Sequence, residues 1–254
     1  MTASTARIAL VTGANKGVGY AIARQLAEKD HAVWLGARDE SRGAAAEAEL
    51  RAAGLDVRWV ALEVTDDASV AAATARIDAE SRRLDVLVNN AAVSKPWAKP
   101  SRTLVSDVEA SLATNVLGYI RVTNAVLPLL RKSSAARIVN ISSVIGSLSA
   151  ASTNHDPTGM FADGEFPVIL AHSLTKSAIN SLTISYANEL RGEAILVNAV
   201  SPNWTRTDGS WHTGPFSPEE GARGPVRMAT LPDDGPTGTF TVTTAGGGVQ
   251  ELPW

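Results

Sequence analysis

Short apolar runs alternate with helical patterns along nearly the whole chain, and this alternation limits the folds available to it. The expected strands are residues 8–11, 32–35, 57–61, 85–88, 137–141, 194–200 and, as the last edge strand, 238–242. The helical patterns cover residues 18–28, 41–53, 67–82, 103–131 and 171–190, and a capping box at 217–220 starts another helix. Continuously apolar strands are typical of a parallel sheet buried on both faces. The sequence therefore predicts an α/β fold with helices on both sides of the sheet.

Composition excludes several classes of partner. The 254 residues are 44% hydrophobic, which is enough for the core of one α/β domain. A net charge of −3 gives no concentrated basic face for nucleic acid or an acidic membrane. Cysteine is absent, and the four histidines have no metal-ligand spacing. With no membrane-length apolar run and no signal-peptide segment, we expect a cytoplasmic protein without a metal site.

A glycine loop, TGANKGVG at residues 12–19, joins the first expected strand to the first helix. The missing side chains at Gly13, Gly17 and Gly19 let the backbone approach a pyrophosphate, which the N–H groups at the helix start then bind. Arg38, at the end of the second strand, suits a 2′-phosphate, with Lys16 as a second cation. Asp39, the next residue, is a carboxylate that can instead bind the 2′-hydroxyl of a ribose without a phosphate. These features predict a site for NADP(H), unless Arg38 and Lys16 are only solvated surface cations.

These motifs resemble the short-chain dehydrogenase/reductase family, and in particular its carbonyl-reductase branch. The loop fits the family pattern TGxxxGxG, residues 89–92 (NNAA) resemble its NNAG, and residues 141–143 (ISS) precede a helix with the expected lysine. The resemblance covers about residues 7–200, and residues 220–238 are also similar. It implies a single domain over residues 1–254, with a Rossmann-type doubly wound parallel sheet of about seven strands. It also implies NADP(H) as cofactor and a small-molecule substrate.

The resemblance gives each site residue an expected role. Asn115 holds a relay water, Ser143 binds the substrate oxygen with Ser142 as the alternative, and Lys176 binds the nicotinamide ribose and lowers the pKa of the neighbouring acid. The expected cofactor-binding residues are Gly13, Asn15, Lys16, Gly17, Val18, Gly19, Arg38, Glu63, Val64, Asn90, Lys176, Pro202, Thr205 and Thr207. Asn203 stands where the family has a glycine after Pro202. Purely structural roles are the alternative for Asn115, Ser143 and Lys176.

Position 172 departs from the family pattern, because a histidine replaces the tyrosine expected four residues before the lysine. Histidine can act as an acid or base near neutral pH. Beside Lys176, however, its cationic form is disfavoured and its pKa should fall. Its side chain is also shorter than that of tyrosine, so that a water would have to bridge it to the substrate. The alternative is that His172 merely starts the helix; Tyr20, Tyr119 and Tyr186 have no evident route to the site.

Two long stretches interrupt the alternation and are expected to build the substrate site. The inserted stretch, residues 146–168, brings His155, Asp156, Asp163 and Glu165 near the mouth of the site. There any of them can act as a new acid or base; the alternative is a solvated loop without a catalytic role. Residues 201–230 form a substrate-binding loop and lid. We expect Trp204, Trp211 and His155 to bind substrate. The two tryptophans with Phe161 favour a flat aromatic or polycyclic molecule, or else pack within the lid.

The inserted stretch precedes a helix that builds dimers in the family, which leaves both a monomer and a homodimer open. The glycines at 246–248 predict a mobile tail.

Three functions are compatible with these residues. The first is NADPH-dependent reduction of a ketone or aldehyde, with the proton coming from His172 or from a water ordered by His172, Ser143 and Asn115. The second is a non-redox dehydration, isomerisation or cyclisation with His172 as general base. The third is a catalytically inactive NADP-binding protein. Because Asn115, Ser143 and Lys176 are all present, we expect the first.

Overall fold

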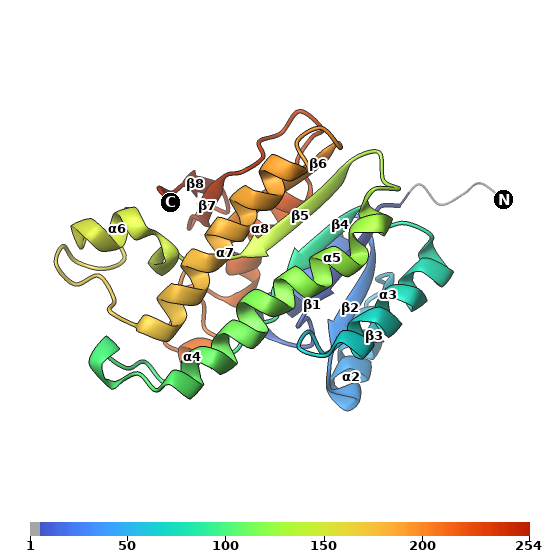
Figure 1. The fold of residues 1–254 in the computed structure, drawn as a ribbon. Helices are drawn as coiled ribbons and strands as arrows, with labels where there is room; N and C mark the ends of the chain where they lie inside the picture. Colours follow the sequence, from blue (N-terminus) through green and yellow to red (C-terminus); the bar gives the residue numbers. More distant parts are fainter. Residues whose placement is uncertain (1–5) are drawn as a thin grey trace.

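The computed structural model describes residues 6–254, which form an eight-stranded sheet with helices on both faces (Figure 1). The strand order is β3-β2-β1-β4-β5-β6-β7-β8, and all neighbouring strands are parallel except β7 and β8. The strands are β1 (Ile8–Thr12), β2 (Ala32–Ala37), β3 (Val57–Ala61), β4 (Val86–Asn89), β5 (Ala136–Ile141), β6 (Ile195–Ser201), β7 (Phe240–Thr243) and β8 (Val249–Glu251). The predicted doubly wound α/β fold is confirmed. The strand order reverses between β1 and β4, where such sheets leave a crevice at the carboxyl ends of the strands.

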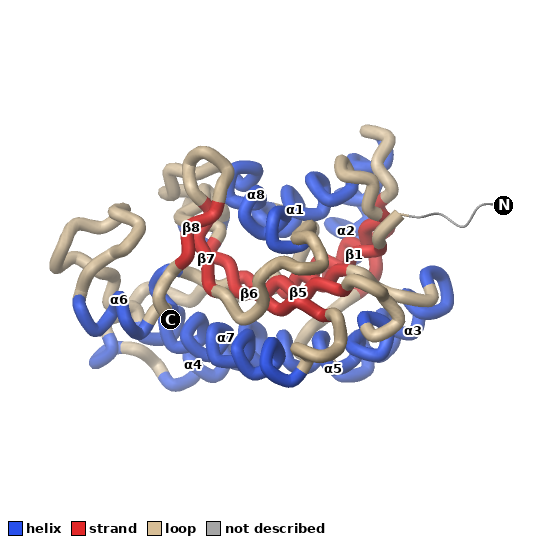
Figure 2. Tube along the Cα trace, turned by 90° about the horizontal axis from the view of Figure 1, so that it is seen from above, coloured by secondary structure: helices blue, strands red, loops and turns tan. Residues whose placement is uncertain are grey.

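The helices divide between the two faces of the sheet. Figure 2 shows α1, α2 and α8 on one face and α3, α4, α5 and α7 on the other. The helices are α1 (Gly17–Ala27), α2 (Glu40–Ala52), α3 (Asp67–Ser81), α4 (Val105–Leu112), α5 (Gly118–Leu130), α6 (Leu148–Thr153), α7 (Leu170–Glu189) and α8 (Pro218–Ala229). The predicted capping box is confirmed, since Ser217 N donates to Glu220 Oε2 at 2.8 Å and α8 begins at Pro218.

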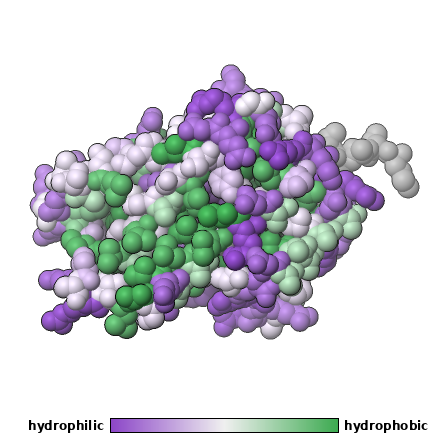
Figure 3. All heavy atoms as spheres, viewed as in Figure 1, coloured by the Kyte–Doolittle hydropathy of each residue, from purple (hydrophilic) through white to green (hydrophobic). Residues whose placement is uncertain are grey.

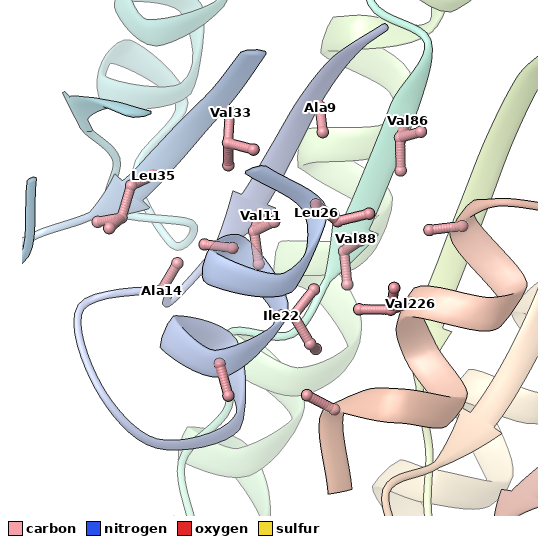
Figure 4. Close-up of a cluster of buried hydrophobic side chains, with 14 of the residues drawn as sticks. Ala9, Val11, Ala14, Ile22, Leu26, Val33, Leu35, Val86, Val88 and Val226 are labelled. Atoms are coloured by element: carbon pink, nitrogen blue, oxygen red, sulfur yellow. The ribbon is translucent and has the colours of Figure 1, made fainter. Parts of the chain in front are cut away.

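Each face of the sheet has its own core, and neighbouring residues of one strand contribute to opposite cores. In β1, Ala9 and Val11 pack toward α1 and α8, whereas Leu10 packs toward α3 and α5. Figure 4 shows the first core, in which Leu26 of α1 and Val226 of α8 lie against the strands. Because both faces of a central strand are buried, its sequence is a nearly continuous apolar run. The strand positions were therefore predictable.

The edge of the sheet near the C-terminus differs from the predicted last strand and mobile tail. Residues 238–242 were expected to form the last strand, followed by a mobile tail, but the chain turns back and adds β8 antiparallel to β7. Residues 246–248 lie in the hairpin turn, which Thr244 N closes by donating to Gly248 O at 3.0 Å. The sheet thus has eight strands instead of about seven. A strand of 3 residues is too short for its periodicity to be visible in the sequence.

Two helical segments also differ from the prediction. The inserted stretch is not a loop throughout, because it contains α6, which Ser147 caps by accepting from Ala150 N at 3.0 Å. A helix of 6 residues has too few turns to show an apolar repeat. The helix expected over 103–131 begins later and carries a π-turn over Ala113–Leu117 between α4 and α5. Pro128 lies inside α5, which continues to Leu130.

Apolar side chains gather on the face formed by α4, α5 and α7 (Figure 3). The exposed apolar residues in and beside these helices are Leu104, Val105, Leu117, Leu170, Leu174 and Ile184. The inserted stretch therefore leaves this face of α7 uncovered, and the choice between monomer and homodimer stays a prediction. Within residues 6–254, no helix combines the length and apolar character needed to cross a membrane.

Candidate active site

A cavity of about 820 Å³, called here the central cavity, lies at the carboxyl ends of the parallel strands. Its walls come from the loops that follow β1 to β6 and from the first turns of α7. All of the cofactor-binding residues expected from the sequence line this cavity, as do Ser143, His172 and Trp204. Asn115, His155 and Trp211 do not line it, although Thr114 does. The fold therefore brings most of the expected site together from six separate loops.

The glycine loop lies tightly against the end of β4. A Cβ at Gly13, where φ is +63°, would lie 2.8 Å from the Ala91 Cα, and a Cβ at Gly19 would lie 2.4 Å from the Asn90 side-chain nitrogen. Asn90 fastens this contact, because its side-chain amide donates to the carbonyls of Thr12 and Gly13 at 2.9 and 3.2 Å. The start of α1 has no side-chain cap. Its N–H groups are therefore available to an anion in the central cavity.

Two arginines line the central cavity beside the end of β2. Arg38 is mostly exposed and lies 3.3 Å from the Glu63 carboxylate. Desolvation raises the pKa of Glu63, but hydrogen bonds from Thr65 and Arg38 outweigh it and hold that pKa below its usual value. Asp39, the expected competitor for a ribose hydroxyl, is committed to capping α2, where it accepts from Arg42 N at 2.9 Å.

Arg42 is the second of these arginines, and sequence reasoning missed it. It stands three residues after its cap, Asp39, in the first turn of α2. This turn follows the end of β2, so a cation there faces the same site as Arg38. The spacing of a capping aspartate and an arginine at the head of the second helix is the signal that would have found it.

Lys16, the expected second cation, lines the central cavity together with Arg38, and it also has a partner within the protein. Its ammonium pairs with Asp208 in the loop after β6, and His212 Nε2 lies 3.0 Å from the same carboxylate. The hydrogen bond and the charge of Lys16 lower the pKa of Asp208. This pair connects the glycine loop to the substrate-binding loop and lid, and both partners line the central cavity.

Asn115 is fully buried in the π-turn and secures the loop that follows β4. Its Oδ1 accepts from Val93 N at 2.8 Å, and its Nδ2 donates to Val93 O at 3.1 Å and to Thr175 Oγ1 at 3.4 Å. The side chain therefore joins this loop to α7 and is closed off from the central cavity. A π-turn in this place is consistent with a site, since such turns often mark functional positions.

The two serines after β5 have different surroundings. The Ser142 hydroxyl is buried and donates to Asn180 Oδ1 at 2.6 Å and to Lys176 O at 3.4 Å. The Ser143 side chain is partly exposed to the central cavity, and no hydrogen bond to it occurs within residues 6–254. Ser143 is therefore the serine whose hydroxyl is available to a bound molecule, as the primary assignment expects.

Lys176 and His172 lie one helical turn apart on α7 and share one electrostatic environment. Lys176 is buried, its Nζ donates to Ile141 O at 2.7 Å, and burial lowers its pKa to about 8. Burial and, second, the charge of Lys176 lower the pKa of His172 to about 3. The His172 ring has no hydrogen-bond partner within residues 6–254. At neutral pH it is an uncharged imidazole that faces the central cavity.

No tyrosine replaces the missing phenol. None of Tyr20, Tyr119 and Tyr186 lines the central cavity, as expected from the sequence. Tyr119 is fully buried and its hydroxyl donates to Ile141 O at 3.3 Å, while burial raises its pKa far above the usual value. Tyr186 donates instead to Asn124 Oδ1 at 2.8 Å.

Aromatic rings from two loops form one wall of the central cavity. Phe161, from the inserted stretch, lies 5.9 Å from Trp204, with an angle of 31° between the ring planes. Trp211 instead packs edge-on against Trp97 at 5.1 Å, and it is Trp97 that lines the cavity. His155 is exposed and pairs with Asp163 at 2.6 Å. Of the three residues expected to bind substrate, only Trp204 lies at the cavity, because the other two face solvent or neighbouring loops.

Comparisons with known proteins agree with this geometry. A family described as short chain dehydrogenase matches residues 7–155. Carbonyl reductase (NADPH) 1 of Sus scrofa is 35% identical to this chain, and the match covers 99% of this chain and 98% of the relative. The (-)-isopiperitenone reductase of Mentha piperita is 33% identical, and the match covers 94% of this chain and 96% of the relative. The crystal structure of NADPH-bound carbonyl reductase from chicken fatty liver has a TM-score of 0.82 at 25% identity, over 98% of this chain and 99% of that one. The structure of salutaridine reductase from Papaver somniferum has a TM-score of 0.78 at 28% identity, and the match covers 92% of this chain and 99% of that one.

The protonation of His172 is directly measurable. In a ¹H–¹⁵N NMR titration of the imidazole signals, His172 should stay neutral until the pH approaches 3. Lys176→Met should raise this pKa only in part, since burial is the larger cause. A His172 midpoint near the ordinary value of about 6.5 would contradict the environment described here.

The lowered pKa of His172 also makes the stability of the folded protein depend on pH. Between about pH 6.5 and 3 the unfolded chain binds the His172 proton and the folded chain does not, so stability falls as the pH falls through this range. His172→Gln should make the free energy of unfolding, measured in urea, less dependent on pH over this interval. An unchanged pH dependence would show that His172 titrates normally in the folded protein.

Proposed function

Because this chain belongs to the short-chain dehydrogenase/reductase family, we propose that it reduces a ketone or aldehyde with NADPH and that an ordered water delivers the proton. The observation that carries this proposal is that Ser143, His172 and Lys176 line one cavity, with Lys176 bonded to the end of β5. Lys176 is buried there, the Ser143 hydroxyl is available, and no tyrosine reaches the cavity. These observations support a site in which Ser143 and Lys176 bind the carbonyl oxygen and its proton source without a tyrosine.

The residues present fit NADP(H). The backbone of the glycine loop and the start of α1 would hold the pyrophosphate, and Arg38 with Arg42 would hold the 2′-phosphate. The remaining contacts would come from Glu63 and Val64 on the adenine side and from Asn90, Lys176, Pro202, Thr205 and Thr207 on the nicotinamide side. When bound, NADPH supplies the hydride for the carbonyl carbon. The start of α1 supports this fit, because its first N–H groups have no side-chain cap and its first residues line the central cavity.

His172 is poorly suited to donate the proton itself. With a pKa of about 3 it is neutral near pH 7, and the N–H of a neutral imidazole is a very weak acid. Lys176, with a pKa of about 8, is a better proton source, and its ammonium has donors left beyond the bond to Ile141 O. His172 and Ser143 bind the water that passes this proton to the substrate oxygen. The Ser143 hydroxyl donates to the same oxygen as its negative charge develops.

The aromatic wall favours a flat substrate. Phe161 and Trp204 present two rings, tilted by 31°, in the same cavity as the residues that would bind the carbonyl oxygen. Rings in such arrangements attract further aromatic rings by offset stacking. We therefore propose an aromatic or polycyclic ketone, aldehyde or quinone as substrate.

The two other functions have less support. A non-redox step needs His172 as general base, but an imidazole whose conjugate acid has a pKa of about 3 is a weak base at neutral pH. An inactive NADP-binding protein has no need for a buried ammonium group, which is costly to keep in the interior.

The direct test is the loss of NADPH absorbance over a panel of quinones, polycyclic ketones and aldehydes, with wild type, His172→Tyr, His172→Ala and Lys176→Met in parallel. We expect wild type to turn over and Lys176→Met to lose on the order of 100-fold in kcat, the usual contribution of a general acid. Turnover by His172→Tyr alone would refute reduction by the natural site and favour the non-redox function. Full activity of His172→Ala would show that His172 does not bind the water.

Arg38→Ala tests the choice of cofactor. The KM for NADPH should rise about 10- to 100-fold, because one charge-assisted hydrogen bond to the 2′-phosphate is lost, while the KM for NADH should change little. Arg24→Ala is the matched control, since Arg24 pairs with Glu28 on α1 and does not line the central cavity. Equal changes for both cofactors would contradict the assignment of Arg38.

A further inference from the structure

The inserted stretch supplies one side of the central cavity through the segment that runs from α6 to α7. Met160, Phe161 and Pro167 line the cavity, and the segment stands at one end of the molecule beside α6 (Figure 1). Loops rarely hold an apolar wall rigidly unless their own backbone is fixed. The question is therefore what fixes the backbone at Phe161.

A buried carboxylate organises this segment. Asp156 is only 3% exposed, and its side chain accepts hydrogen bonds from Thr158 N at 2.8 Å, Thr158 Oγ1 at 2.7 Å, Met160 N at 2.8 Å and Phe161 N at 2.9 Å. Within residues 6–254, no lysine or arginine lies within ion-pair distance of it. Buried aspartates are rare unless they are paired, so the segment compensates this charge with its own N–H and O–H groups.

The carboxylate controls the wall directly, because one oxygen, Oδ2, accepts from both Met160 N and Phe161 N. The Phe161 ring is then set between Phe166 at 6.4 Å and Trp204 at 5.9 Å. Phe166 is itself tied to the start of the segment, since its N–H donates to Asn154 Oδ1 at 3.0 Å. The three rings and the carboxylate thus form one unit that joins the inserted stretch to the loop after β6.

We propose that Asp156 is a positioning residue that fixes the Phe161–Trp204 wall and thereby makes the enzyme select flat, fused-ring carbonyl compounds over small aldehydes. This inference rests on the proposed reductase function and deepens it. Asp156 acts through the backbone of Met160 and Phe161 and does not line the central cavity itself. A small aldehyde reaches Ser143 without needing the wall, whereas a fused-ring ketone stacks on it.

The test compares two substrates, 1-acetonaphthone and propanal, in wild type and Asp156→Asn. The substitution keeps the volume but places an NH₂ group where the carboxylate faces N–H donors, so at least one of these bonds is lost. The KM for 1-acetonaphthone should rise roughly five- to tenfold, the scale of one lost aromatic contact. The kcat/KM for propanal and the Kd for NADPH should change less than about twofold. Asp163→Asn is the matched control, because Asp163 lies in the same segment, is exposed and pairs with His155.

A second variant covers the case in which Asp156→Asn loses activity on both substrates through misfolding, detected by circular dichroism. Phe161→Ala should then give the same selective rise in KM for 1-acetonaphthone. Equal effects of Phe161→Ala on both substrates, or no effect of either variant on the KM ratio, would overturn the inference.

Calorimetric titration of 1-acetonaphthone into the NADP⁺ complex separates this inference from the proposed function. One outcome is that wild type binds 1-acetonaphthone, that Asp156→Asn binds it more weakly, and that neither protein turns it over. This outcome would support the role of Asp156 in fixing the aromatic wall and refute the proposed reductase function. Turnover of 1-acetonaphthone with an unchanged KM in Asp156→Asn would support the reductase and refute the role of Asp156.

Discussion

One hydrogen bond, from the buried Lys176 ammonium to the Ile141 carbonyl at 2.7 Å, determines the chemistry of the central cavity. It holds α7 against the end of β5, and His172, one turn earlier on α7, lines the same cavity as Ser143. The burial that makes this bond possible lowers the pKa of Lys176, and the lysine charge helps to keep His172 neutral. Burial therefore lowers the pKa of both groups, and the lysine charge adds to the effect on His172, which is why a histidine at position 172 does not simply replace a tyrosine as the acid.

Much of the fold was predictable because its signals are local. The buried strands, such as β1 with Ala9, Leu10 and Val11, are continuous apolar runs, and the glycine loop lies at a strand–helix junction that fixes its purpose. The substitution of Asn203 for a glycine is also explained locally. Its φ of +67° is in the left-handed region that asparagine tolerates, and its amide donates to Thr243 O at 3.0 Å.

The features that sequence reasoning missed are those that depend on distant or very short segments. The Lys16–Asp208 pair joins two loops whose residues are 192 positions apart, so no spacing rule predicts it. Asp156 resembles a solvated loop acid until the segment is folded around it. The helix α6 and the strand β8 are too short to show periodicity. Asp39 was an open alternative for cofactor binding, and only the start of α2 shows that it serves as a cap.

The proton route is tested most directly by the pH dependence of kcat/KM for a flat aromatic ketone at saturating NADPH. The group that supplies the proton must be charged, so the rate should hold through pH 7 and fall above about pH 8, the pKa of Lys176. The slope should approach about tenfold per pH unit. A rate that already falls as the pH rises through about 6.5, the ordinary pKa of histidine, would identify the His172 imidazolium as the donor and contradict the water route.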